Sequence, residues 1–360
     1  MSLTIALYLI AGFILLVIGA EVLVRGAARL AAGFGISPLI VGLTVVAFGT
    51  SAPEMAVSTQ SAFNAQGDIA IGNVVGSNLF NVLLILGLCA VIAPLVVSKR
   101  LVIVDVPLMI LASLLAWFLG FDGQYDRLDG AILFGCIVAY TGYLVVSSIR
   151  AKQRGEAVEV DDEYLDGSSG KFTTLKHLAF IIVGLVMLVG GSTLLVNGSV
   201  SLAKALGMSE LVIGLTIVAV GTSLPELATS LIAAIKGERD MAVGNIVGSN
   251  LFNLLAVLGL AGLVSPIPIN ISPAAITFDY PVMIVVAAAC LPIFYTGWKI
   301  SRWEGLLFLG YYAAYTCYLI FNAQGNPAAH SLLEITLWYL TPLTLAILLF
   351  TSVRAWRLQA

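Results

Sequence analysis

The sequence predicts an all-α polytopic membrane protein: an inverted five-plus-five transmembrane helix repeat with broken helices, plus an eleventh C-terminal helix. Three observations lead to this fold class. The 360 residues are 60% hydrophobic and 10% charged, with a mean hydropathy of +1.04, whereas soluble domains carry about 25% charged residues. Apolar stretches of about 20 residues, which suffice to cross a bilayer, recur along the chain. Two long motifs each occur twice.

The apolar stretches divide into five, five and one. The N-terminal stretch lacks a basic region and is too long for the core of a signal peptide, so we interpret it as the first span. We expect the first repeat at 1–149, a polar linker at 150–173, the second repeat at 174–321, and an extra helix and tail at 322–360. The spans are predicted near 3–24, 37–64, 70–95, 101–120, 129–149, 174–196, 209–235, 241–264, 275–296, 303–321 and 332–353.

The repeated motifs define the two halves. GLTVVAFGTSAPEMAVSTQ begins at Gly42 and returns at Gly214 as GLTIVAVGTSLPELATSLI, with 12 of 19 positions identical at an offset of 172 residues. DIAIGNVVGSNLFNVLLILGL begins at Asp68 and returns at Asp240 as DMAVGNIVGSNLFNLLAVLGL, with 15 of 21 identical. Because each repeat has an odd number of spans, the second enters the membrane from the opposite side. Such inverted repeats bring equivalent motifs together near the middle of the bilayer.

Basic residues predict the orientation. If the N-terminus is outside, 15 of the 17 lysines and arginines fall on cytoplasmic segments, and only Arg127 and Lys204 fall on the other side. We therefore expect the 150–173 loop and the C-terminus in the cytoplasm. The acidic residues of this loop could hold a regulatory calcium ion. They lack the glycine turn and ligand order of an EF-hand, so we interpret the loop as solvated.

Each copy of the first motif places a glutamate, Glu54 or Glu226, inside an apolar stretch. A charged residue at the centre of a membrane helix costs about 2.5–3.5 kcal/mol on insertion scales, so two at matching positions suggest a functional site. Pro53 and Pro225 precede them, and a proline removes one helical N–H and frees a carbonyl four residues back. In a membrane, free carbonyls are tolerated where they line a cavity or bind a ligand.

The second motif supplies further oxygen atoms. Ser77 and Asn81 are four residues apart and share a helix face, as do Ser249 and Asn253. Its glycines form GxxxG pairs, which we expect to pack helices closely. Oxygen ligands without histidine or cysteine suit Ca²⁺ or Na⁺. The alternative for any single proline, serine or threonine is a helix kink or ordinary packing.

A third near-repeat places an aspartate two residues before a proline, in Asp105-Val-Pro107 and Asp279-Tyr-Pro281. An aspartate near a helix start is a good N-cap and suits the helix dipole. We expect both aspartates to cap helices rather than take part directly in transport.

GTSxPE followed by GNxxGSNxFN, present twice, resembles the cation/calcium exchanger superfamily, and within it the sodium/calcium exchangers of prokaryotic type. The resemblance implies a secondary antiporter, not an enzyme. It would have no cofactor and would carry Ca²⁺ and Na⁺ through a lipid bilayer by alternating access. An inward Na⁺ gradient would drive Ca²⁺ out across a bacterial or archaeal inner (plasma) membrane. Three Na⁺ per Ca²⁺ would move one net charge, about 2.3 kcal/mol per 100 mV.

The resemblance also implies roles for individual residues. The Ca²⁺ ligands would be Glu54, Glu226, Thr50 and Thr222. One Na⁺ site would be formed by Ser51, Ser77, Glu54 and the Ala47 carbonyl, and the other by Ser223, Ser249, Glu226 and the Ala219 carbonyl. Asn81 and Asn253 would line the middle. The potassium-dependent relatives have an aspartate at one of these two positions, so we expect no potassium requirement here.

Other functions remain open at this stage. A H⁺/Ca²⁺ exchanger could use the same glutamates as proton carriers. A calcium channel would normally gather its acidic ring from several subunits around an axis, whereas this duplication lies within one chain. A membrane enzyme is disfavoured, because the sequence has no HExxH, GxSxG or phosphate-binding glycine loop. We expect no nucleic-acid partner, and the oligomeric state is open.

Overall fold

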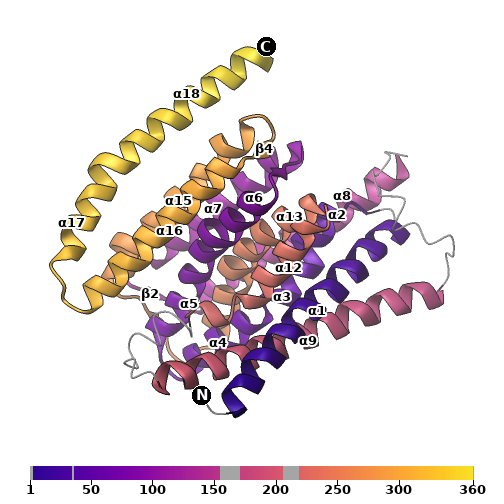
Figure 1. Cartoon of the computed structure of the whole chain (residues 1–360), viewed down its shortest axis with the longest axis horizontal. Helices are drawn as coiled ribbons and strands as arrows, with labels where there is room; N and C mark the ends of the chain where they lie inside the picture. Colours follow the sequence, from indigo (N-terminus) through magenta and orange to yellow (C-terminus); the bar gives the residue numbers. More distant parts are fainter. Residues whose placement is uncertain (1–2, 35, 155–170, 206–218, 360) are drawn as a thin grey trace.

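The protein is almost entirely helical, as the sequence predicts (Figure 1). This computed structural model describes residues 3–34, 36–154, 171–205 and 219–359. Within these ranges, two short antiparallel strand pairs each join one half of the sequence to the other. They pair β1 (Leu95–Val96) with β4 (Lys299–Ile300), and β2 (Gln124–Tyr125) with β3 (Ile269–Asn270).

The helices of the first half include several π-helical and 3₁₀ segments, labelled η. In chain order they are α1 (Leu3–Phe34), α2 (Pro38–Val41), η1 (Gly42–Val46), α3 (Ala47–Thr50), α4 (Ala52–Phe63), α5 (Gly67–Leu79), η2 (Phe80–Leu86), α6 (Gly87–Ile92), η3 (Leu101–Asp105), α7 (Val106–Leu119), η4 (Gly120–Asp122) and α8 (Arg127–Gln153).

The second half repeats this order and then adds a further helix. Its elements are α9 (Lys171–Ala205), α11 (Ala219–Gly221), α12 (Leu224–Ile235), α13 (Arg239–Leu251), η7 (Phe252–Val257), α14 (Leu258–Val264), η8 (Ala275–Asp279), α15 (Tyr280–Tyr295), α16 (Arg302–Ala323), α17 (Ala328–Ile335), η9 (Thr336–Leu340) and α18 (Thr341–Gln359).

Most of the predicted spans have a helical counterpart. Nine helices among the described residues are long and apolar enough to cross a membrane, and a bent pair supplies a tenth. The remaining predicted span, 209–235, lies partly outside the described residues, and its second part is α12. Several helices extend beyond their predicted ends. The first continues from the predicted 24 to Phe34, helped by an ion pair of 2.6 Å between Arg25 and Glu21 one turn apart.

The linker and repeat boundaries stay predictions. α8 continues to Gln153 and α9 begins at Lys171, so helices occupy both ends of the predicted 150–173 linker. Residues 155–170 of that linker, including its acidic centre, lie outside the described residues.

The helix break expected at the first proline is present. Pro38–Thr50 and Ala52–Phe63 meet at 46°, with the break at Ser51. Pro53 then lies in the first turn of α4, where a missing N–H leaves no helical bond unmade. Pro225 takes the same place in α12. Each motif therefore sets its glutamate in the first turn of a new helix.

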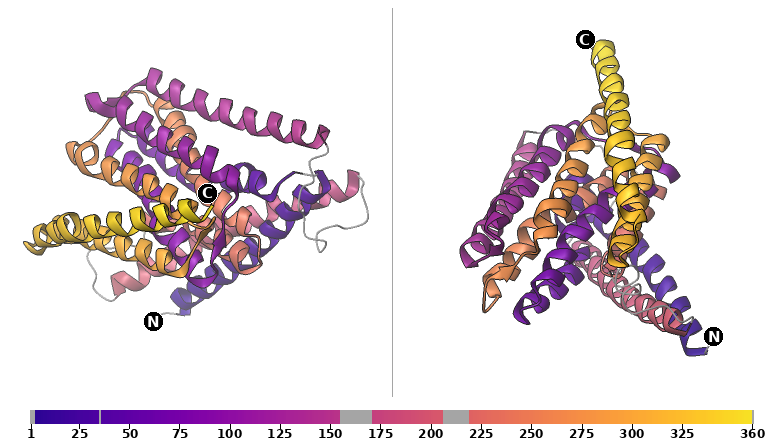
Figure 2. Two further views of the ribbon diagram at one scale, coloured as in Figure 1. Left: turned by 90° about the horizontal axis from the view of Figure 1, so that it is seen from above. Right: turned by 90° about the vertical axis from the view of Figure 1, so that its left-hand side faces the viewer.

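Two long helices, α1 and α9, pack on each other along glycines (Figures 1 and 2). A Cβ added at Gly12 would meet the carbonyl oxygen of Gly191 at 2.8 Å, and one added at Gly184 would meet that of Gly19 at 2.8 Å. These contacts are related by the 172-residue offset. The two halves of the protein are therefore joined by a pseudo-two-fold arrangement, as expected for inverted repeats.

The extra C-terminal helix is present as well. Ala328–Thr351 forms an apolar helix of 24 residues on the periphery of the protein (Figure 1). α17 packs on α16 and α18 packs on α15. The hydroxyls of Tyr311 and Thr344 lie 2.8 Å apart and share a hydrogen bond. Exposed aromatic and aliphatic side chains cover its other face, as suits a surface in contact with lipid.

Candidate ion-binding site

The two Pro-Glu motifs, distant in sequence, meet in the centre of the protein. Ser223 Oγ donates a hydrogen bond to Glu54 Oε1 at 2.7 Å, and Ser51 Oγ donates one to Glu226 Oε1 at 3.1 Å. All four residues have 0% of their surface exposed. The serine of each motif thus holds the glutamate of the other motif, across the boundary between the repeats.

The threonines of the motifs bond to the partner helices of the opposite repeat. Thr50 Oγ1 donates to Asn245 Oδ1 at 3.3 Å, and Thr222 Oγ1 donates to Asn73 Oδ1 at 3.2 Å. These threonines and asparagines again correspond at an offset of 172 residues. The site therefore contains every predicted threonine and serine of the Pro-Glu motifs.

Two serines outside the predicted site orient these asparagines. Asn73 Nδ2 donates to Ser58 Oγ at 2.9 Å, and Asn245 Nδ2 donates to Ser230 Oγ at 2.9 Å. Sequence reasoning missed Ser58 and Ser230. The signal was available, because each lies four residues after a motif glutamate and recurs at the repeat offset.

The middle of the site is formed by four asparagine amides. Asn81 Nδ2 donates to Asn250 Oδ1 at 3.0 Å, and Asn253 Nδ2 donates to Asn78 Oδ1 at 3.3 Å. Asn81 and Asn253 lie in the π-helical segments η2 and η7. Such wider turns are rare in proteins and occur frequently at functional sites.

Several buried oxygens of this cluster have no hydrogen-bond partner among the described residues. They are Glu54 Oε2, Glu226 Oε2, Asn81 Oδ1, Asn253 Oδ1 and Ser249 Oγ. A buried acceptor without a partner is costly, and a buried carboxylate is more so. Four of these five atoms, the carboxylate and amide oxygens, can only accept, so a bound cation would satisfy them.

The chemistry of the donors restricts the cation. The cluster offers carboxylate, amide and hydroxyl oxygens, which are hard ligands suited to Ca²⁺ or Na⁺. The described residues contain no group of three or more His, Cys, Asp or Glu side chains that could hold a metal ion. Ligation therefore depends on two carboxylates supplemented by neutral oxygens.

The two remaining predicted serines, and the two predicted backbone carbonyls, have different hydrogen-bond partners in the two halves. Ser77 Oγ lies 3.0 Å from Ser223 Oγ, whereas Ser249 Oγ has no partner among the described residues. The Ala47 carbonyl accepts the N–H of Ser51 at 3.0 Å. In the second half, Ser223 N–H donates instead to Val220, and Ala219 lies at the start of α11. A cation at Ala47 would share its carbonyl with the backbone.

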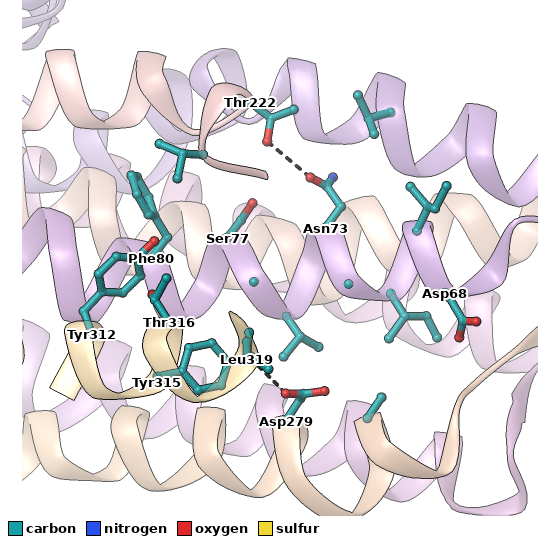
Figure 3. Close-up of a pocket in the computed structure, with 18 of the residues that line it drawn as sticks. Asp68, Asn73, Ser77, Phe80, Thr222, Asp279, Tyr312, Tyr315, Thr316 and Leu319 are labelled. Carbon is teal, nitrogen blue, oxygen red and sulfur yellow. Dashed lines mark hydrogen bonds between the residues drawn. The ribbon is translucent and has the colours of Figure 1, made fainter. Parts of the chain in front are cut away.

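A cavity reaches the cluster from the side of Thr222. A cavity of about 450 Å³ is lined by Asn73, Ser77 and Thr222 (Figure 3). Their counterparts Asn245, Ser249 and Thr50 are buried, and so are all residues from 241 to 250.

The glycines of the second motif also differ between the two repeats in how closely they are packed. A Cβ at Gly244 would meet the Leu39 carbonyl at 2.9 Å, and one at Gly248 would meet the Ala47 Cβ at 2.8 Å. Within the described residues, a Cβ at Gly72 or Gly76 would meet no atom within 4 Å, and both glycines line the cavity. The expected close packing of GxxxG pairs is confirmed for the second copy. For the first copy it stays a prediction, because residues 206–218, which include the counterparts of Leu39 and Leu43, lie outside the described residues.

The predicted caps at Asp105 and Asp279 are wrong. Neither side chain makes a capping hydrogen bond. Tyr140 Oη donates to Asp105 Oδ1 at 3.1 Å, and Tyr315 Oη donates to Asp279 Oδ1 at 2.9 Å. Helix pairing brings these tyrosines to the aspartates, and residues 35 or 36 positions apart cannot be matched from local sequence patterns.

The fold and the site together define a class of protein: a membrane transporter with inverted repeats and a buried cluster of carboxylate, hydroxyl and amide oxygens at their junction. Residues 4–148 and 176–321 match the family described as sodium/calcium exchanger protein. The chain belongs to the sodium/calcium exchanger family.

Individual relatives align over most of this chain and most of their own length. The inner membrane protein YrbG of Escherichia coli is 39% identical over 282 residues, which cover 78% of this chain and 85% of YrbG. The sodium/calcium exchanger MaX1 of Methanosarcina acetivorans is 31% identical over 352 residues, covering 88% of this chain and 98% of MaX1. A solved structure of the sodium-calcium exchanger NCX_Mj superposes with a TM-score of 0.76 and 31% identity, covering 89% and 100% of the two chains.

Proposed function

We propose that this protein exchanges Na⁺ for Ca²⁺ across its membrane as a secondary antiporter. The observation that carries the proposal is the pair of fully buried glutamates, each with one oxygen bound by a serine of the other repeat and one without a partner. Two carboxylates neutralise one Ca²⁺, and monovalent cations can replace it. Membership of the family and the likeness to the sodium/calcium exchangers MaX1 and NCX_Mj support this assignment.

We propose the ligands of each ion from the family resemblance, within this cluster. We assign Ca²⁺ to the centre, between the Glu54 and Glu226 carboxylates, with hydroxyls of Thr50 and Thr222. Two Na⁺ sites would flank it, one at Ser51, Ser77, Glu54 and the Ala47 carbonyl, the other at Ser223, Ser249, Glu226 and the Ala219 carbonyl. In the present state the motif serines are exchanged: Ser51 binds Glu226, and Ser223 binds Glu54 and lies 3.0 Å from Ser77. The unpartnered amide oxygens of Asn81 and Asn253 support a middle position for them.

The reciprocal bonds suggest how exchange is enforced. An empty site would hold two uncompensated carboxylates away from water, which is costly. The site should therefore change its side of access only when cations are bound. The second state would exchange the roles of the two repeats, closing the cavity beside Thr222 and opening its counterpart beside Thr50.

Direction and location form part of the same proposal. The basic residues favour an outside N-terminus and cytoplasmic 150–173 loop and C-terminus, and the name of YrbG favours a prokaryotic inner membrane. An inward Na⁺ gradient would then drive Ca²⁺ out of the cell. With three Na⁺ per Ca²⁺, each cycle would move one charge and respond to voltage by about 2.3 kcal/mol per 100 mV.

Ca²⁺ uptake into proteoliposomes tests the proposal. Vesicles loaded with Na⁺ should take up Ca²⁺, and vesicles loaded with K⁺ should not. Vesicles loaded with acidic buffer and no Na⁺ form the third arm. Uptake in that arm alone would overturn the Na⁺ assignment and make the same glutamates proton carriers.

A further inference from the structure

The cavity that reaches the ion cluster carries a carboxylate that the proposed ligands leave unused. Asp279 lines this cavity together with Gly72 and Gly76, and it lies on the opposite side of α5 from Thr222 (Figure 3). Ser77, which also lines this cavity, lies 3.0 Å from Ser223, which binds Glu54. Asp279 therefore shares one cavity with hydroxyls of the site.

No base among the described residues balances the charge of Asp279. Tyr315 of α16 donates a hydrogen bond from its hydroxyl to Asp279 Oδ1 at 2.9 Å. The ion pairs found among the described residues do not include Asp279. Asp68 lies on the same cavity at the beginning of α5, and it too is absent from those pairs. The part of the cavity wall that the structure describes thus has negative charges without an ion-pair partner.

The corresponding aspartate of the first repeat is in a different state. Asp105 precedes Asp279 by 174 residues and is bound in the same way by a tyrosine, Tyr140. However, it is 0% exposed, and Arg100 Nε lies 3.7 Å from its Oδ2. The position that corresponds to Arg100 in the second repeat is Ala274, which has no charge.

We infer that Asp279 is a positioning residue for the exchange reaction, which draws cations into this cavity and favours divalent ions over monovalent ones. In the opposite state, Asp105 takes the corresponding place on the other route, where Arg100 neutralises it. The two routes therefore differ in their attraction for Ca²⁺. This inference rests on the proposed function and adds an electrostatic difference between the two faces of the membrane.

The preference for divalent ions follows from charge alone. The energy of an ion in a given potential is proportional to its charge, so a potential that enriches Na⁺ by a factor f enriches Ca²⁺ by f squared. Clefts lined by one sign of charge raise local counter-ion concentration and association rates by about 10- to 1,000-fold. A single carboxylate that enriches Na⁺ about 3-fold would enrich Ca²⁺ about 10-fold.

Ca²⁺ transport kinetics of Asp279→Asn, measured separately from each face, test the inference. Right-side-out and everted membrane vesicles expose opposite faces of the protein. From the face of the cavity, we expect KM for Ca²⁺ to rise about 10-fold and the half-saturating Na⁺ concentration to rise about 3-fold. From the other face, both values should stay as in the wild type. Asp122→Asn, which changes an exposed carboxylate of η4 away from the cavity, is the matched control.

A second variant guards against a general effect on folding. Ala274→Arg leaves Asp279 in place and adds, at an exposed position, the arginine that the first repeat has. It should raise KM for Ca²⁺ in the same face-specific way. Added choline chloride should reduce the difference between wild type and Asp279→Asn, because the Debye length falls to about 3 Å at 1 M salt.

Each outcome decides between the alternatives. Equal KM changes on both faces, unchanged KM in both variants, or a salt-independent difference would overturn the inference. A wild-type protein that shows no Na⁺-dependent Ca²⁺ flux would overturn the proposed function instead. If protons drive the flux, the comparison of KM for Ca²⁺ still tests Asp279.

Discussion

Ser223 donates a hydrogen bond of 2.7 Å to Glu54, a residue of the other repeat. The reverse relationship, from Ser51 to Glu226, measures 3.1 Å. Because each glutamate is held by the opposite repeat, a movement of one repeat against the other changes both carboxylates at once. These two hydrogen bonds would thereby link the positions of the carboxylates to the movement that changes the side from which the cluster is reached.

The two glutamates should be indispensable for Ca²⁺ transport. Glu54→Gln and Glu226→Gln each remove one of the two charges that neutralise Ca²⁺. Removing one partner from a buried pair of opposite charges, here a glutamate that faces Ca²⁺, costs about 3–5 kcal/mol. We therefore expect Ca²⁺ exchange to fall about 100-fold or more.

Ca²⁺ uptake and a size-exclusion profile check this prediction together. Glu334→Gln, which alters an exposed glutamate of α17 with 58% side-chain exposure, is the matched control and should transport normally. Normal exchange in both buried variants, with the protein folded, would remove the proposed site.

Substitution of the motif serines should weaken ion binding without abolishing it. Ser223→Ala and Ser51→Ala each delete a hydrogen bond to a carboxylate, which is worth about 1.5–3 kcal/mol, or about 10-fold or more in affinity. By the pseudo-symmetry, the two variants should raise the half-saturating Na⁺ concentration to a similar extent. A Na⁺ titration of Ca²⁺ release measures this, and an unchanged titration in either variant would contradict the ligand assignment.

Much of this site could be predicted from the repeats. The sequence has two glutamates in apolar stretches at the repeat offset, and each repeat has an odd number of spans. These two facts were enough to predict that the motifs meet. Helical spacing also placed Ser77 with Asn81 and Ser249 with Asn253 on shared faces. These inferences depend on periodicity and pairing, which sequence carries directly.

Other features depend on packing between distant segments, which sequence does not carry. The tyrosine partners of Asp105 and Asp279 come from helices that follow about 35 residues later. The two copies of the glycine motif are nearly identical in sequence, yet Gly72 faces a cavity and Gly244 packs on Leu39. A symmetric sequence cannot indicate which of its halves is open.

Close packing between α1 and α9 yields a prediction about stability. A Cβ at Gly184 would lie 2.7 Å from the backbone nitrogen of Leu23. Overpacking of this kind costs about 1–3 kcal/mol, so Gly184→Ala should lower Tm. Gly190→Ala, six residues along the same helix, meets no atom within 4 Å and should be neutral or slightly stabilising. Equal Tm values for the two variants would argue against tight contact between these helices.

An ion pair between α1 and α12 should help to keep the closed side closed. Lys236 Nζ lies 3.1 Å from Glu21 Oε1. The corresponding pair at the open side would join Thr193 and Asn64, which carry no charge. Partly exposed pairs contribute about 0.2–1 kcal/mol, so Lys236→Gln should shift the two states by up to about 5-fold.

Thiol labelling measures that shift. Val57 lines the open cavity, whereas its counterpart Thr229 is 0% exposed. In a background without native cysteines, Lys236→Gln should increase the labelling of Thr229→Cys by a water-soluble reagent and decrease that of Val57→Cys. Parallel changes at both positions would indicate loosening of the fold rather than a shift between states.

We expect Ca²⁺ and Na⁺ to compete for one cluster held by Glu54 and Glu226. Equilibrium Ca²⁺ binding to the purified protein, titrated with Na⁺, tests this competition most directly. We predict one Ca²⁺ per chain, displaced by Na⁺ with a Hill coefficient above one, and loss of Ca²⁺ binding in both Glu→Gln variants. Ca²⁺ binding that is indifferent to Na⁺, or that survives both substitutions, would contradict it.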